Sequence, residues 1–110
     1  MDEYIRELAR FEGADIGIDR GFVLTLSGSF TYAPGGAGQG FGLYIDGEFI
    51  KRFMGAFNAE RLSAVNGRIC WVTHNLGDIR LIEPVFSKDG KPFDVQAWKD
   101  EKQAKRETNA

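Results

Sequence analysis

Four glycines repeat at every second position between residues 36 and 42, a spacing that could serve phosphate binding. Backbone amides of a glycine-rich loop before a helix cradle anions, and a lysine or arginine adds charge. The segment contains neither the G-x-x-x-x-G-K-S/T nor the G-x-G-x-x-G spacing of nucleotide-binding motifs. Two interpretations therefore remain open, a structural requirement for close backbone approach and a site for a phosphorylated nucleotide. The second interpretation uses Gly36, Gly38, Gln39, Gly40, Phe41, Gly42, Tyr44, Lys51 and Arg52.

Residues suited to catalysis or metal binding are few. His74 is the single histidine, and the single cysteine is Cys70. On one strand these two side chains would be roughly 13 Å apart, which is too far for direct contact. A metal would have to use His74 with Asp78, Glu83 or Cys70, without the compact spacing typical of such sites. We therefore expect no enzyme activity, no metal and no cofactor, with a hydrolase that uses His74 and Asp78 as a minority hypothesis.

Aromatic residues near arginine form a second set of candidates. The chain has nine Phe, three Tyr and two Trp, which is a large apolar supply for 110 residues. Most of them are expected in the core, and the remainder on a partner surface. Trp and Tyr beside Arg are frequent anchors of protein interfaces. We predict such a surface in the second half of the chain, formed by Trp71, His74, Arg80 and Trp98.

Charge and composition limit the classes of partner. The formal net charge is −2, so there is no basic field to hold a phosphate backbone, and direct nucleic-acid binding is not expected. Cys70, within the apolar run at residues 69–72, predicts the reduced, buried thiol of a cytosolic protein. The first residues are acidic, and no apolar run approaches the ~18 residues of a membrane span. We expect no membrane association and a cytoplasmic location.

Strands and one amphipathic helix would position these residues. Apolar and polar residues alternate over residues 22–32, which predicts a half-buried strand paired with an extended segment that begins at about residue 8. Asp46 is placed to cap a helix whose solvated side carries Lys51 and Arg52. The apolar stripe of that helix consists of Phe49, Ile50, Phe53, Met54 and Phe57.

The second half of the chain predicts shorter elements. Asn58 is expected to cap a short helix, and two strands follow at residues 68–74 and 79–82, where Pro84 prevents a further ladder bond. Asp94 is placed to cap a last short helix.

These elements together predict an α+β fold. A single antiparallel sheet of two β-hairpins, in ββαββ order, would be covered on one face by the amphipathic helix, with short additional helices. We expect one domain over residues 1–98 and a polar tail over residues 99–110, as a frayed helix or a disordered segment. An exposed edge of a sheet with glycine-flattened segments could also pair two copies as a homodimer.

The glycine segment resembles a motif of a known family. Residues 32–44 are similar to the G-G-x-G-Q-G-F-G-G-Y segment of a widespread, largely uncharacterised family of small bacteriophage and prophage proteins. The similarity covers roughly residues 14–86, including Glu60-Arg61-Leu62 and the strand that contains Ile79-Arg80-Leu81-Ile82. The resemblance implies a phage or prophage origin and no known enzymatic activity.

Analogy with small, acidic phage proteins suggests what such a chain does. We expect a non-enzymatic accessory protein that binds and blocks a host protein or complex, as anti-CRISPR-like inhibitors of host defence do. The alternative is a sponge that sequesters a nucleotide signal, with the glycine loop and Lys51 or Arg52 closing over a phosphorylated ligand.

Overall fold

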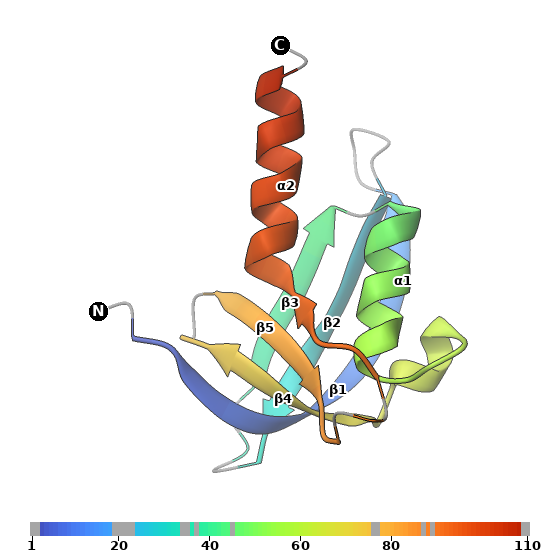
Figure 1. Cartoon of the computed structure of the whole chain (residues 1–110). Coiled ribbons are helices and arrows are strands. Elements are labelled where there is room, and N and C mark those ends of the chain that lie inside the picture. The colour runs from blue at the N-terminus through green and yellow to red at the C-terminus, as the bar shows by residue number, and fades with distance from the viewer. Residues whose placement is uncertain are drawn as a thin grey trace.

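A computed structural model of the chain describes residues 3–18, 24–33, 36, 38–44, 46–75, 78–86, 88 and 90–108. Its elements are the strands β1 (Ile5–Ile18), β2 (Leu24–Tyr32) and β3 (Gly38–Tyr44), the helix α1 (Gly47–Ala56), the 3-10 helix η1 (Leu62–Val65), the strands β4 (Ile69–His74), β5 (Ile79–Pro84) and β6 (Phe93–Asp94), and the helix α2 (Val95–Thr108). The strands form one antiparallel six-stranded sheet in the order β3-β2-β1-β4-β5-β6. Helix α1 lies over one face of this sheet, and α2 rises from the end that carries β6 (Figure 1).

The α+β class and the antiparallel sheet are therefore confirmed, but the predicted ββαββ order is wrong. It omits β6 and treats the glycine segment as a loop, whereas residues 38–44 form the strand β3. This segment pairs with β2 over its whole length, with Gly38 opposite Thr31 and Phe41 opposite Gly28. The ladder with β2 and the burial of Phe41 offset the intrinsic cost of glycine in a strand, which is roughly 0.5–1 kcal/mol per residue.

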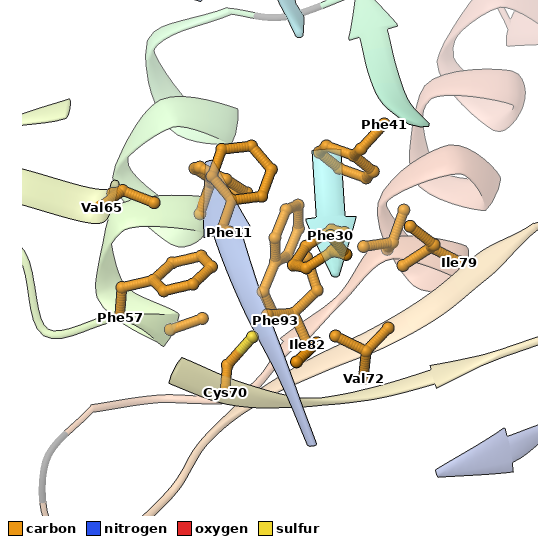
Figure 2. Close-up of a cluster of buried hydrophobic side chains, with 14 of the residues drawn as sticks. Phe11, Phe30, Phe41, Phe57, Val65, Cys70, Val72, Ile79, Ile82 and Phe93 are labelled. Atoms are coloured by element: carbon orange, nitrogen blue, oxygen red, sulfur yellow. The ribbon is translucent and has the colours of Figure 1, made fainter. Parts of the chain in front are cut away.

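Phenylalanine rings fill the core between the sheet and the helices (Figure 2). Phe11 is fully buried on β1, and its ring lies 4.8 Å from that of Phe30 on β2 and 5.3 Å from that of Phe53 on α1. The ring of Phe41 stacks on that of Phe53 at 5.7 Å. Edge-to-face and offset contacts of this kind add to the stabilisation from burial. The predicted apolar stripe of the helix thus faces the core through Phe49 and Phe53.

Helix α1 begins at its predicted cap. An Asp46 carboxylate oxygen, Oδ1, accepts a hydrogen bond from the amide of Phe49 at 2.9 Å, and Lys102 of α2 donates to Oδ2 at 2.6 Å. The Lys102 hydrogen bond, together with the one from the Phe49 amide, lowers the pKa of Asp46 below its ordinary value. Asp46 therefore both starts α1 and connects it to α2.

Replacement of Asp46 by alanine should lower the free energy of unfolding at pH 7 by about 1 kcal/mol, the typical cost of a lost N-cap. Because the folded-state pKa of Asp46 is depressed, its contribution is present at neutral pH and is lost as the pH falls through the range of the carboxyl group. Urea unfolding at pH 7 and pH 3 measures both effects. The exposed Asp15→Ala is the control and should change little; an equal loss for Asp46→Ala at both pH values would contradict the prediction.

The expected cap of the short helix differs from the structure. Asn58 has a positive φ of 52° and does not cap the short helix, whose N-cap is Arg61 without a side-chain bond. Helix α2 continues through Thr108, so residues 99–108 of the predicted tail are helical, the first of the two alternatives for this segment. Glu101 contacts Arg52 of α1 at 3.2 Å. This ion pair joins the start of the predicted tail to the folded unit, and fraying of its end in solution stays a prediction.

Candidate functional site: the open face of the sheet

The side chains of the sheet alternate between two unlike faces. One face is the core, to which all three helices contribute buried residues, namely Phe53 of α1, Val65 of η1 and Trp98 of α2. The side chains that alternate with the buried ones point to the opposite side, which we call the open face. Its residues include Arg6, Leu8, Arg10, Glu12 and Asp15 on β1, Thr25, Ser27, Ser29 and Thr31 on β2, Gly38, Gly40 and Gly42 on β3, Ile69, Trp71 and Thr73 on β4, and Leu81 and Glu83 on β5.

Trp71 lies at the centre of the charged and apolar half of the open face. The guanidinium carbon of Arg6 lies 4.4 Å from the centre of the Trp71 ring, within the range of a cation–π contact. Nε of Arg6 also contacts Oε1 of Glu83 at 2.9 Å. Leu8 is the cross-strand neighbour of Trp71 on β1. These neighbours hold the indole in place while leaving its side chain only half-buried.

A hollow of about 280 Å³ lies beside Trp71, where β1, β2 and β4 approach the turn after β2. Its lining includes Leu8, Arg10, Thr31 and Ile69, and Gly36 contributes from the turn. Gly36 has a φ of 68°, which glycine adopts without strain, and its amide donates to the carbonyl of Tyr32 at 3.1 Å. Ile69 is 53% exposed at this position. The hollow is thus largely apolar, with one arginine and one threonine.

The residues predicted to cradle a phosphate do not converge. Gly38 and Gly40 belong to the open face, whereas Phe41 is buried in the core at 7% exposure. Arg52 is paired with Glu48 at 3.1 Å as well as with the Glu101 carboxylate described above. Of the other residues in this set, Gln39 accepts a hydrogen bond from the Tyr32 hydroxyl, Lys51 is exposed on α1, and Gly42 and Tyr44 lie in β3 opposite Ser27 and Thr25. Because alternate residues of β3 lie on opposite faces of the sheet, the residues predicted to bind a phosphate do not form one site. Nucleotide binding stays a prediction from the sequence.

The prediction of a surface position for His74 is wrong. Its ring is 1% exposed and stacks on Tyr32 with centroids 3.9 Å apart. Its Nε2 lies 2.8 Å from Oε1 of Glu7. Burial, followed by the charge of Glu7, raises the pKa of Tyr32 above its ordinary value. The expected surface position of Trp98 is also wrong, since its side chain is 4% exposed.

Arg80 is exposed as predicted, and its guanidinium carbon lies 4.3 Å from the centre of the Tyr4 ring. Sequence reasoning missed Arg6 and Leu8, which lie beside Trp71, and considered Glu83 only as a metal ligand. An alternation between Arg6, Leu8 and Arg10 on one side and Glu7 and Ala9 on the other was the signal that could have found Arg6 and Leu8.

The reactive side chains Cys70 and Asp78 are buried and paired, respectively. Burial raises the pKa of the Cys70 thiol to about 12, and its side chain has no exposed area. Asp78 accepts hydrogen bonds from Tyr4 and from Lys99, which outweigh the opposing effect of burial and lower its pKa. No three His, Cys, Asp or Glu side chains cluster in a metal-binding arrangement within the described part of the chain.

The comparisons with known proteins give no family. No protein-family model, curated protein or solved structure matches the chain. Among the described residues, no helix has the length and apolar character required to cross a bilayer. The candidate site therefore depends on the geometry of the open face alone.

Proposed function

We propose that this chain is a non-enzymatic binding protein that docks the open face of its sheet onto another protein. The observation that carries the proposal is the half-buried Trp71 held under Arg6 on a face to which the core-forming helices do not contribute. Tryptophan and arginine are the residue types most enriched among binding hot spots. The neighbouring hollow, with Leu8 and the exposed Ile69, supplies apolar surface next to the indole.

The shape of the open face supports a protein as the partner. On β2 its side chains are serine and threonine, and on β3 Gly38, Gly40 and Gly42 lie opposite Thr31, Ser29 and Ser27, so another backbone can approach these positions closely. Charges of both signs, from Arg6, Arg10 and Glu83, lie around the apolar centre. An apolar centre with a polar rim is the usual anatomy of a protein interface.

The wider role that we propose is that of a phage or prophage accessory protein, which blocks a component of host defence in the bacterial cytoplasm. The resemblance of residues 32–44 to a bacteriophage protein segment motivates this role. The burial of His74 and Cys70 supports inhibition by occupancy of a partner surface, since neither side chain is accessible for chemistry.

Replacement of Trp71 by alanine should weaken binding to the partner about 30-fold, which corresponds to the roughly 2 kcal/mol of a hot-spot residue. Immobilised wild-type protein, Trp71→Ala and Lys51→Ala would be exposed to the same bacterial lysate, and captured proteins quantified by mass spectrometry. Lys51 is exposed on α1, on the other side of the sheet, and serves as the matched control. The captured protein would then be purified and its affinity for each variant measured by calorimetry.

We expect one protein to be captured by the wild type and by Lys51→Ala, and to be lost with Trp71→Ala. Equal capture by all three baits, or capture of nothing, would contradict a binding role for the open face. Phage plating on a defence-positive strain that expresses each variant tests the wider role separately. Plaque numbers should rise with the wild type and with Lys51→Ala, but not with Trp71→Ala.

A further inference from the structure

The two edges of the sheet differ in how well they are protected. The edge at β6 is two residues long and leads directly into α2, and its neighbour β5 ends at Pro84. The edge at β3 is seven residues long, from Gly38 to Tyr44, and β3 has β2 as its sheet neighbour on one side only. Short edge strands and proline are devices that prevent sheets from pairing with each other. Only the β6 edge has these devices.

The described strand β3 also has no charge, no proline and no bulge to protect its edge. Its sequence, GQGFGLY, contains no charged residue and no proline. Its register with β2 runs from Thr25 opposite Tyr44 to Thr31 opposite Gly38 without a bulge. An edge strand that has no bulge and no charge offers a row of backbone N–H and C=O groups to another strand.

We propose that a second copy of this chain pairs antiparallel with β3, so that two six-stranded sheets join into one of twelve strands. Antiparallel pairing of a strand with itself about a two-fold axis makes every contact twice, and no like charges meet because β3 carries none. A Cβ atom built on Gly40 would meet no described atom within 4 Å, so there is room for a side chain at this position of the edge strand.

The features around β3 favour a second copy over a foreign peptide. A peptide that adds to a sheet edge gains its specificity from side-chain pockets beside the edge. Among the described residues, the hollow on the open face is lined by β1, β2, β4 and the turn that contains Gly36, and none of its lining comes from β3. Backbone pairing between identical strands requires no such pocket.

The length of the contact sets the expected strength. Pairing of two seven-residue strands buries less than the standard protein interface of about 1,600 Å², which places this dimer among weak and reversible ones. We expect a dissociation constant of about 10 μM. The dimer would place the two Trp71 side chains on one continuous open face. Dimer formation does not depend on whether the open face binds a partner.

Light scattering and sedimentation of the purified chain, from about 1 to 500 μM, measure this equilibrium. Three variants sharpen the test. Gly40→Lys and Gly40→Glu each place a charge in the edge strand. In the proposed dimer the two copies of residue 40 are diagonal neighbours across the two-fold axis, roughly 7–8 Å apart, so their like charges repel each other. Ser27→Lys is the control, because it places a charge on the same face one strand further from the edge, opposite Asp15.

We expect each Gly40 variant to weaken the dimer at least about tenfold and Ser27→Lys to change it less than about threefold. An equimolar mixture of the Lys and Glu variants should restore dimer formation, a result that loss of folding cannot produce. In the wild type, amide hydrogen exchange of residues 38–44 should slow as concentration rises. A wild type that stays monomeric at 500 μM, or a dimer that protects amides elsewhere and not in β3, would overturn the proposal.

Discussion

Replacement of Gly28 by valine is expected to lower the free energy of unfolding by about 3 kcal/mol, the upper part of the range for overpacking a core. A Cβ atom at Gly28 would lie 2.2 Å from Cζ and 2.7 Å from Cε2 of Phe11, and 3.0 Å from the carbonyl oxygen of Glu12. The Phe11 ring cannot move aside freely, because it is fully buried and contacts the rings of Phe30 and Phe53. Chemical denaturation followed by circular dichroism measures the loss.

Gly17→Val is the matched control for this prediction. Gly17 also lies in a strand, but a Cβ atom there meets nothing within 4 Å, so we expect a change within about 0.5 kcal/mol. A double-mutant cycle identifies the cause. Gly28→Ala combined with Phe11→Leu should be at least about 1 kcal/mol less destabilised than the sum of the single variants, since the smaller side chain gives the methyl group room. Equal losses for Gly17→Val and Gly28→Val would contradict the close approach.

The Gly28 contact illustrates what the sequence could and could not predict. Alternation over residues 22–32 was sufficient to predict the strand that became β2. The requirement for glycine at position 28 could not be predicted, because it depends on the register that places Phe11 of β1 over that position. Local periodicity specifies the faces of a strand, while contacts between strands depend on pairing that the alternation does not encode.

Pairing between strands also decided the conformation of the glycine segment and the surroundings of His74, and local sequence did not predict either. Low strand propensity at Gly38 and Gly40 favoured a loop, but pairing with β2 and burial of Phe41 decided the outcome. The sequence places His74 on one strand with Cys70, as the structure confirms, yet its partner Glu7 comes from β1. The open face was missed for a similar reason, since Arg6 and Glu83 meet only after β1, β4 and β5 are aligned.

Cys70 should react with a thiol reagent at least about a thousandfold more slowly in the native protein than in denaturant. At pH 8, a thiol with a pKa of about 12 holds roughly a thousandfold less thiolate than an ordinary thiol with a pKa near 9. The side chain also has no exposed area, and its strand is paired on one side with Ala9 of β1 and on the other with Pro84 of β5. Stopped-flow absorbance with an aromatic disulfide reagent measures both rates.

The pairing of β4 with both neighbours implies that Cys70 becomes accessible only when the whole sheet opens, so its labelling rate reports global unfolding. Gly28→Val should then accelerate labelling by about a hundredfold, because a loss of about 3 kcal/mol raises the unfolded population by that factor. A Cys70→Ser variant that also carries Ser27→Cys is the control, with its thiol on the exposed open face, and should label rapidly in either background. If Gly28→Val leaves the Cys70 rate unchanged, β4 opens locally and the central strands are not one cooperative unit.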